Sequence, residues 1–526
     1  MMYKLKKRYR FRIIAPAYPA FNIYSNIASR TTALGPVYVA TAVNKMQEWD
    51  AEMIDENNLR LHGPKSKAGG ADHEFLQRQK PADVVGFYGG LTSTIPRLYQ
   101  LADFYKKQGA ITIAGGQHFV AENIHEGLTR GIDYIVIGEG EETIRELLEA
   151  IQGKRETAEV KGIAFLRNGQ VIKTPPREPV IDFDRLPMPD FSLVRYAKIK
   201  IYPVERIRGC GMDCEFCTVR GIPRPAAPER LLEQIRLLVE TRDARHFFIV
   251  DDLFGQQREE TIQFCQSLQS YQRQNHLHLN LTAQIRLDKA KDTQLLSAMR
   301  QAGINAVAIG FESPIPEELK AMNKHIKPQE MLSLTKVFRK HGFLVHGMFI
   351  FGYPMSEGVS FSMAAPERVK QYQQFIRRAR LDTIQILIPI PLPGTELRKR
   401  LKQQNRVFSI QEVGWEYYDG NFPVFLPDAP LSVEQLQSST KKIMASFYRF
   451  PYFFKIGFNV LLFPGLIFFL SNIKFGWRKW YRIWRNDLVR FMGWMIIRKW
   501  NLNFQKERFF EKLQLLERRW PKWENI

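Results

Sequence analysis

The sequence is poor in cysteine and has no long unbroken apolar run. Only 4 of its 526 residues are Cys, and three of these lie close together while Cys265 stands alone. A disulfide framework is therefore not expected. The basic N-terminal stretch has no long apolar segment before a small-residue cleavage site, which predicts no signal peptide and a cytoplasmic location.

Acidic residues are also fewer than basic residues, so the net charge is +22. Such an excess predicts an anionic partner, either nucleic acid or an anionic membrane face. The charge is uneven: residues 441–526 contain 18 Lys and Arg against 5 Asp and Glu, together with seven of the nine Trp.

The most apolar segment of this tail, residues 456–471, is broken by Pro464 and Gly465. It is also shorter than the roughly 20 residues that a spanning helix needs. We interpret residues 451–526 as a basic, Trp-rich helical tail that lies in the membrane interface. One alternative is a helical pair packed on the preceding domain with Trp in its core. The other is a nucleic-acid-binding protein, and the long apolar runs among the cations argue against it.

Residues 1–155 alternate nearly continuous apolar runs with segments of helical period. The runs at 10–16, 51–56, 83–90, 111–116 and 133–140 predict parallel strands buried on both faces. The helical segments lie between them. This pattern predicts a doubly wound, Rossmann-like α/β domain, whose ligands bind at the carboxyl ends of the strands.

The rest of the chain predicts three further parts before the tail. Residues 156–200 contain five Pro and little periodicity, which favours a linker. Residues 201–400 resume the alternation with six β/α units, typical of a partial parallel (β/α)6 barrel. Residues 401–450 are interpreted as a C-terminal extension of that barrel.

Three cysteines form the most specific motif, in the sequence RGC(210)GMDC(214)EFC(217). Three thiolates can hold three irons of a cubane and leave the fourth open to another ligand. The alternative is a structural zinc site, which needs four ligands. No His lies nearby in the sequence, and Cys265 lies in a helix-like segment as a small hydrophobic residue.

The CxxxCxxC spacing, with Phe216 before the last Cys, resembles the signature of radical S-adenosylmethionine (SAM) enzymes. The resemblance implies a 4Fe-4S cluster on Cys210, Cys214 and Cys217, with SAM on the open iron. It also implies SAM-binding positions at the ends of successive strands: Phe216, Asp251, Asp252, Arg286, Glu312, Ser313, Gly347 and Gly352. Taken singly, these residues have ordinary structural explanations, such as a helix cap for the Asp pair.

The N-terminal domain resembles the cobalamin-binding domain of one large radical SAM branch, which includes the anaerobic magnesium-protoporphyrin cyclases and the hopanoid methylases. The first strand and its loop contain no Asp-x-His-x-x-Gly element, so a His ligand to cobalt is not expected there. His118, in a Gly-Gly-x-His motif, is interpreted as a contact to the nucleotide tail. The candidate cobalamin-binding residues are Thr92, Ser93, Gly115, Gly116, His118, Gly138 and Gly140. The alternative is a Rossmann-like domain that binds nothing.

The reaction expected from this resemblance is methylation of an unactivated carbon of a small-molecule or lipid substrate. Cobalamin would carry the methyl group, and a second SAM would supply the radical that removes the substrate hydrogen. The alternative within enzymes is a cobalamin-dependent oxidation, cyclisation or rearrangement. With three of four Cys used, a second Cys-ligated cluster is excluded. The expected partners are an electron donor of flavodoxin or ferredoxin type and the inner face of the cell membrane, where the enzyme would be peripheral.

Overall fold

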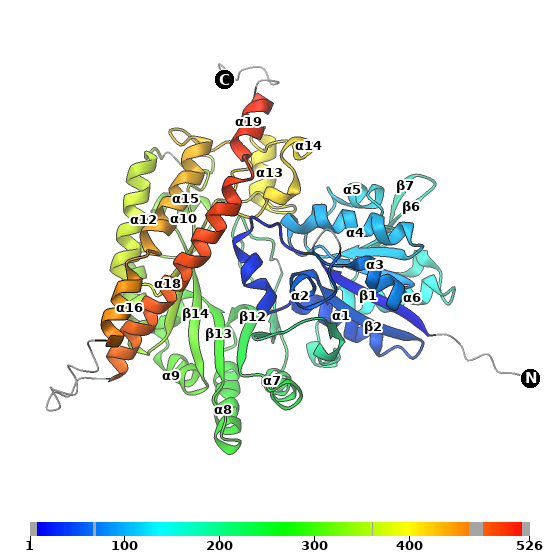
Figure 1. The fold of residues 1–526 in the computed structure, drawn as a ribbon, viewed down its shortest axis with the longest axis horizontal. Coiled ribbons are helices and arrows are strands. Elements are labelled where there is room, and N and C mark those ends of the chain that lie inside the picture. Colours follow the sequence, from blue (N-terminus) through cyan, green and yellow to red (C-terminus); the bar gives the residue numbers. More distant parts are fainter. Residues whose placement is uncertain (1–7, 67–69, 220, 360, 462–476, 518–526) are drawn as a thin grey trace, which may run out of the picture.

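The structure, a computed structural model, describes residues 8–66, 70–219, 221–359, 361–461 and 477–517. An N-terminal α/β unit lies beside a second α/β unit, and the C-terminal helix α18 (Trp477–Gln505) runs diagonally across the molecule (Figure 1). The predicted fold class, a doubly wound domain followed by a partial barrel and a helical tail, is confirmed.

The N-terminal unit is built on an 8-stranded sheet with the order β7-β6-β5-β4-β3-β1-β2-β8. Its central strands are parallel, and the order reverses at β1, as in doubly wound folds. These strands are β1 (Tyr9–Ala15), β2 (Trp49–Asp55), β3 (Val84–Tyr88), β4 (Ile111–Gly115) and β5 (Tyr134–Val136). The principal helices are α1 (Leu34–Asn44), α4 (Ile95–Lys107), α5 (Ile124–Thr129) and α6 (Gly140–Ile151).

Residues 156–200, for which the sequence predicts a linker, add strands to both edges of this sheet. β6 (Ile163–Arg167) and β7 (Gln170–Lys173) form an antiparallel hairpin beside β5, while β8 (Val194–Arg195) pairs with β2. These strands have only two to five residues each, so their two-residue period is hard to recognise in the sequence.

The second unit is a 6-stranded sheet with the order β16-β15-β14-β13-β12-β9, and all its pairs are parallel. Large apolar side chains such as Phe247, Val307 and Phe349 are buried, as expected where helices cover one face. The strands are β9 (Tyr202–Val204), β12 (His246–Phe254), β13 (Asn280–Ile285), β14 (Ile304–Glu312), β15 (Leu344–Ile350) and β16 (Thr383–Leu387). The principal helices are α7 (Pro228–Arg242), α8 (Arg258–Gln274), α9 (Thr293–Gln301), α10 (Pro316–Ala321), α11 (Pro328–Lys340) and α12 (Ala365–Ala379).

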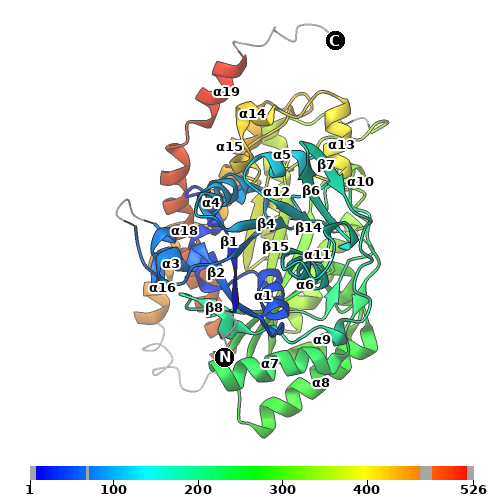
Figure 2. The same cartoon turned by 90° about the vertical axis from the view of Figure 1, so that its right-hand side faces the viewer.

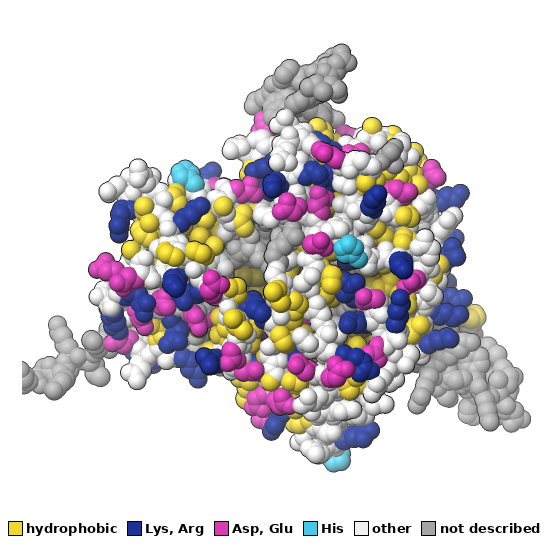
Figure 3. All heavy atoms as spheres, turned by 180° about the vertical axis from the view of Figure 1, so that it is seen from behind, with side chains coloured by type: hydrophobic (Ala, Val, Ile, Leu, Met, Phe, Trp, Pro, Cys, Tyr) yellow, Lys and Arg dark blue, Asp and Glu magenta, His cyan; other side chains and the backbone are white. Residues whose placement is uncertain are grey.

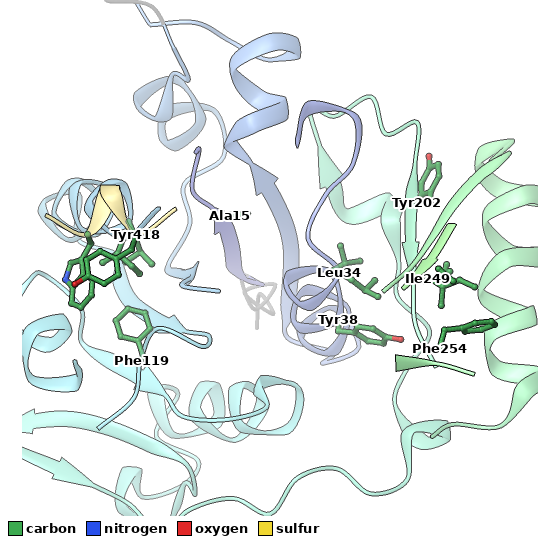
Figure 4. Close-up of a cluster of buried hydrophobic side chains, with 14 of the residues drawn as sticks. Ala15, Leu34, Tyr38, Phe119, Tyr202, Ile249, Phe254 and Tyr418 are labelled. Atoms are coloured by element: carbon green, nitrogen blue, oxygen red, sulfur yellow. The ribbon is translucent and has the colours of Figure 1, made fainter. Parts of the chain in front are cut away.

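The two units share one continuous hydrophobic core. Leu34 and Tyr38 of α1 point toward the barrel residues Tyr202, Ile249 and Phe254, as Figure 4 shows. Viewed from the side of the N-terminal unit, that unit lies in front of the barrel (Figure 2). The large shared core means that the relative position of the two sheets is set by side-chain packing.

Ion pairs between the two units cross the same junction and fix specific points of contact. Arg208 Nη2 lies 2.7 Å from Glu141 Oε1, and Arg224 Nη2 lies 2.6 Å from Glu139 Oε1. At the other side of the junction, Arg398 in α13 (Glu396–Gln403) donates to Glu122 at 2.7 Å. The carboxylates of the N-terminal unit thus meet guanidinium groups of the second unit at separate points.

The C-terminal helices α15 (Val433–Phe447), α16 (Tyr452–Leu461), α18 and α19 (Phe509–Glu517) pack on both units. Ile497, Trp500 and Phe504 of α18 are 5–6% exposed, which supports in part the alternative of a packed helical pair. The predicted apolar run at 456–471 extends beyond α16 into 462–471, outside the described residues. Within the described ranges, no helix combines the length and apolarity needed to cross a membrane.

Candidate functional site

The three clustered cysteines lie on a loop between the short strands β10 (Ile207–Arg208) and β11 (Arg224–Pro225). All three side chains are partly exposed and none forms a disulfide. Gln256 donates to the Cys210 carbonyl at 2.7 Å, and the Cys217 amide donates to the Cys214 carbonyl at 3.1 Å. The loop follows the first strands of the barrel, so the thiols lie at the carboxyl end of the sheet, where ligands of such folds bind.

Glu215 anchors this loop to distant parts of the barrel. Its carboxylate accepts a bidentate pair of hydrogen bonds from Arg400, at 2.6 and 2.9 Å, and a third from the Tyr353 hydroxyl at 2.7 Å. The Glu215 amide donates to the Met322 carbonyl, and its carbonyl accepts from the Leu397 amide. Because bidentate guanidinium–carboxylate pairs are geometrically specific, Glu215 holds the backbone between Cys214 and Phe216 in one place.

Cys265 is separated from this loop by its position in the interior of α8. Its side chain is 1% exposed, and burial raises the pKa of its thiol to about 12. An uncharged, buried thiol is a poor metal ligand. Across the part of the chain that the structure describes, no three His, Cys, Asp or Glu side chains are close enough to share one metal ion. The Cys214 thiol acts on the pKa of Cys210, and the Cys217 thiol acts on the pKa of Cys214. Three thiols on one loop suit a cubane of several irons.

The neighbouring residues Asp251 and Asp252 of β12 have different surroundings. Asp252 Oδ2 accepts from the Gly209 amide at 2.7 Å, next to Cys210, and its side chain is partly exposed. Asp251 is 1% exposed and accepts from the amides of Arg206 and Ile207. Burial raises the pKa of Asp251 to about 7. Asp251 therefore supports the strand before the cysteine loop, whereas Asp252 faces the loop itself.

Arg286, Glu312 and Lys324 surround the other side of the loop. Arg286 Nη1 lies 2.8 Å from the sulfur of Met212, between Cys210 and Cys214. Lys324 Nζ donates to Glu312 Oε1 at 2.8 Å. Burial raises the pKa of the Cys214 thiol, and the Lys324 ammonium opposes this shift. A cation that favours the thiolate is a useful neighbour for a metal-binding cysteine.

The remaining predicted SAM residues have structural partners. Ser313 is fully buried and donates to Glu318, which is paired with Arg368 at 3.0 Å. At Gly347, a Cβ atom would lie 2.6 Å from Leu381 Cδ1, so the glycine is needed for packing. At Gly352, with φ of +74°, a Cβ atom would lie 2.3 Å from Leu436 Cδ1. Phe216 packs edge-on against Tyr353, with ring centroids 6.2 Å apart.

The predicted cobalamin residues lie at the carboxyl ends of β3, β4 and β5. At Gly116, with φ of +119°, a Cβ atom would lie 2.6 Å from the backbone of Gly89, so only glycine allows the two loops to touch. At Gly138 a Cβ atom would meet nothing within 4 Å. Thr92, Ser93, Gly115 and Gly140 lie on the same loops, and Thr92 and Ser93 are buried. The strand ends therefore combine a close backbone contact at Gly116 with an exposed position at Gly138.

His118 is 1% exposed and both of its ring nitrogens have partners. Nδ1 lies 3.4 Å from the Thr92 hydroxyl, and Nε2 lies 3.2 Å from the Asn123 amide nitrogen. The Trp415 ring covers the imidazole edge-on at 4.8 Å. Burial lowers the pKa of His118 to about 3, so the imidazole is neutral and held inside the loop region.

A hydrogen bond joins the two candidate cofactor loops. The hydroxyl of Thr218, directly after Cys217, donates to the Gln117 side-chain oxygen at 3.1 Å. Gln117 is the variable residue of the Gly-Gly-x-His motif, between Gly116 and His118. The carboxyl ends of the two sheets therefore face each other, and the cysteine loop lies against the predicted cobalamin loops.

Sequence motifs do not reveal the roles of five residues of this site. Glu215 and Thr218 lie within or next to the cysteine motif, yet their partners Arg400 and Gln117 are 185 and 101 residues away. Lys324 follows a short helix and belongs to no recognisable pattern. Only the folded chain brings these side chains to the cysteine loop.

Comparison with known protein families agrees with this architecture. Residues 204–358 match the radical SAM superfamily, and residues 23–148 match the B12 binding domain. A radical SAM domain implies a 4Fe-4S cluster and SAM, and a B12-binding domain implies cobalamin. Both matches fall on the sheets described above.

Several characterised and uncharacterised proteins are similar in sequence. An uncharacterized methyltransferase of Pyrococcus horikoshii is 26% identical over 430 residues, which cover 80% of this chain and 88% of that protein. The anaerobic magnesium-protoporphyrin IX monomethyl ester cyclase of Rubrivivax gelatinosus is 25% identical over 72% of this chain and 67% of its own length. The hopanoid C-2 methylase of Rhodopseudomonas palustris is 26% identical over 44% of this chain and 43% of its own length.

Two solved structures share the fold. The radical SAM methyltransferase TsrM from Kitasatospora setae, with cobalamin and a [4Fe-4S] cluster bound, has a TM-score of 0.61 at 15% identity, covering 76% of this chain and 75% of that chain. The cobalamin-dependent radical enzyme OxsB, with aqua-cobalamin bound, has a TM-score of 0.62 at 14% identity, covering 96% and 81%. The chain is thus a radical SAM enzyme that also carries a B12-binding domain.

Proposed function

We propose that this enzyme methylates an unactivated carbon of a small-molecule or lipid substrate. The observation that carries the proposal is the Thr218–Gln117 hydrogen bond, because it joins the cysteine loop to the predicted cobalamin loop. When bound, the cluster and SAM would supply a carbon-centred radical at one loop, and cobalamin would supply the methyl group at the other. A substrate between the loops would be within reach of both.

In this proposal Cys210, Cys214 and Cys217 hold the cluster, and the chain provides the polar groups around it. Asp252 and Arg286 flank the loop on which the thiols lie and would receive the amino and carboxylate groups of SAM. Glu312, oriented by Lys324, would bind the ribose, with Ser313 supporting the same strand end. Phe216, Asp251, Gly347 and Gly352 would shape the pocket through packing and backbone position.

The proposed cobalamin site uses the loops after β3, β4 and β5. The space beside Gly138 would admit the nucleotide tail, while Thr92, Ser93, Gly115, Gly116 and Gly140 shape its walls. His118 would contact the tail and would not ligate cobalt, because Thr92 and Asn123 already bind both ring nitrogens. The proposed boundaries of the functional parts are 1–155 for cobalamin, 201–400 for the radical chemistry, with 156–200 between them, 401–450 after them and the tail at 451–526.

We include two partners in the proposal. A flavodoxin- or ferredoxin-type donor would supply the electron for the cluster. The enzyme would be peripheral on the inner face of the cell membrane, where a lipid substrate is present. The alternative reaction is a radical oxidation, cyclisation or rearrangement. Its support is the similarity to the magnesium-protoporphyrin ester cyclase, which covers 72% of this chain.

The function is tested with the anaerobically reconstituted enzyme, cobalamin, a reductant and SAM carrying a ¹³C-labelled methyl group. Lipid and soluble cell extracts serve as substrate sources, and the products are analysed by mass spectrometry. We expect a product that gains one labelled methyl group and that is absent with Cys217→Ala. A product that changes its hydrogen or oxygen content without the label would instead support the cyclase-type alternative.

The cluster assignment predicts different outcomes for the four cysteines. Cys210→Ala, Cys214→Ala and Cys217→Ala should each abolish the 4Fe-4S absorbance and the iron content of about four per chain, because each removes a thiolate ligand. Cys265→Ala should leave both unchanged, since that thiol is buried in α8. Cluster loss in the Cys265 variant, or retention in the other three, would show that the ligands are misassigned.

Glu215 is predicted to act as a positioning residue for the cysteine loop. Glu215→Ala removes charged hydrogen bonds worth about 1.5–3 kcal/mol each and leaves Arg400 without its main partner. We expect this variant to lose iron faster when a chelator is added, with Tyr353→Phe showing a smaller effect. The matched control is Glu396→Ala, an exposed carboxylate on α13; equal iron loss rates for all variants would remove the positioning role.

The cobalamin site predicts a spectroscopic result for His118. Electron paramagnetic resonance of the cob(II)alamin form should lack nitrogen splitting from a protein imidazole, because burial and two partners hold His118 within its loop. His118→Gln should weaken cobalamin binding without changing that spectrum. Imidazole splitting that disappears in the variant would instead make His118 the cobalt ligand.

A further inference from the structure

The segment that leads into α16 exposes an unusual number of aromatic side chains. Phe450, Phe453, Phe454 and Phe458 are 42–63% exposed, and on the facing helix α18 Met492 and Met495 are 42% and 46% exposed. We refer to these six residues as the apolar face. Three of its rings contact one another, because the ring centroids of Phe450, Phe453 and Phe454 are 5.5–5.8 Å apart. Contiguous exposed apolar surface of this kind marks an interaction site.

A pocket rich in arginine opens beside the apolar face. It has a volume of about 550 Å³ and lies between α11, α12, α15, α16 and α18. We refer to it as the arginine pocket, and no carboxylate is among the described residues that line it. Its charged lining consists of Arg339, Arg377, Arg380, Arg449 and Arg490.

The arginines of the pocket fall into two groups. Arg490 donates to the Leu381 carbonyl at 2.9 Å, and Arg339 donates to the Arg380 carbonyl. Hydrogen bonds to the backbone therefore hold these two side chains in place. Arg377, Arg380 and Arg449 have exposed side chains. The exposed guanidinium groups can therefore turn toward a ligand at low cost.

The nearby carboxylates are too few to neutralise the positive charge of the arginine pocket. Asp382 lies 3.5 Å from Arg339, and it also accepts from the Val345 amide and from Asn486. Asp487 is 7% exposed and is the only acidic residue between positions 449 and 506. Five guanidinium groups against these two carboxylates leave a positive pocket, and guanidinium groups bind phosphate with good geometry.

The pocket and the apolar face meet along one stretch of chain. Arg449 and Tyr452 line the pocket, while Phe450 and Phe453 belong to the apolar face. Seen from behind, Lys and Arg side chains gather along the edge of the molecule that carries these helices (Figure 3). A ligand that suits both surfaces has a phosphate group directly attached to an apolar body.

We propose that the arginine pocket binds the phosphate headgroup of an anionic lipid while the apolar face enters the adjacent hydrocarbon of the same bilayer leaflet. This inference deepens the proposed membrane location and does not depend on methyl transfer. An acidic protein partner would satisfy the cations but would leave the Phe and Met side chains in water. Basic side chains near an anionic leaflet and buried apolar side chains both contribute to such binding.

The proposal is tested by sedimentation of the full-length holoenzyme with vesicles of phosphatidylcholine alone or mixed with phosphatidylglycerol. Arg377→Gln/Arg449→Gln should weaken binding to the mixed vesicles about 30-fold, because two surface cations contribute roughly 1 kcal/mol each. Phe453→Ser/Phe454→Ser should weaken binding in high salt as well, since salt does not screen apolar burial. The charge-matched control is Arg378→Gln/Arg242→Gln, two exposed residues outside the pocket, and the apolar control is Leu502→Ser.

Vesicle binding by the variants and their controls tests the pocket and the apolar face separately. Loss of vesicle binding in the pocket and face variants, with both controls normal, supports the proposal. An equal loss of vesicle binding in the charge-matched control would show that only the net charge of the protein matters. That result would overturn the arginine pocket as the lipid-binding site. Calorimetric titration with inorganic phosphate distinguishes a lipid headgroup from a free anion. If the protein binds phosphate tightly but does not bind vesicles, and Arg377→Gln/Arg449→Gln abolishes the phosphate binding, the pocket is a site for a free anion. Because all variants should retain cobalamin absorbance and 5′-deoxyadenosine release, a failure here is distinguishable from a failure of the proposed reaction.

Discussion

The docking of the two parallel sheets is the constraint on which the rest of the site depends. Ligands of such sheets bind at the carboxyl ends of the strands, so each unit alone offers only half of a reaction site. The ion pairs of Arg208, Arg224 and Arg398 with carboxylates of the N-terminal unit hold these ends face to face. The shared core extends between the units without a break, and large packed interfaces resist sliding. The short distance between Thr218 and Gln117 is a consequence of this docking.

Within that frame, the cysteine loop has almost no regular structure of its own and is held by side chains from elsewhere. Glu215 binds Arg400 and Tyr353, Gln256 binds the Cys210 carbonyl, and Asp252 binds the Gly209 amide. Each anchor lies at or just after the carboxyl end of a barrel strand or in α13. The cluster site proposed on this loop would keep its ligands in place when the ligand on the open position changes, because rigid elements hold the loop.

The C-terminal helices combine two roles that the sequence presents as alternatives. The end of α18 near Trp500 is buried against the body of the protein, where Phe504 stacks on Phe422 with ring centroids 4.5 Å apart. The middle of α18, together with α16, exposes the Phe and Met side chains beside the arginine pocket. A packed helix can thus present an interaction surface, because only one face of a helix needs to contact the core.

The sequence by itself determined the order of the α/β units and the class of cofactor chemistry, because strand periodicity and thiol spacing are local properties. The assignment of the cluster to Cys210, Cys214 and Cys217 stays a prediction. The sequence did not reveal that β6, β7 and β8 extend the first sheet, because strands of only two to five residues carry little periodicity. It also grouped Asp251 with Asp252, although successive residues of a strand point to opposite faces, and here Asp251 binds backbone amides while Asp252 faces the loop. The tertiary structure alone decided the partners of Glu215 and Thr218 and the position of Lys324. It also decided which side chains of the tail are buried and which are exposed. These features depend on side chains that are up to 185 residues apart, and no local pattern specifies such contacts.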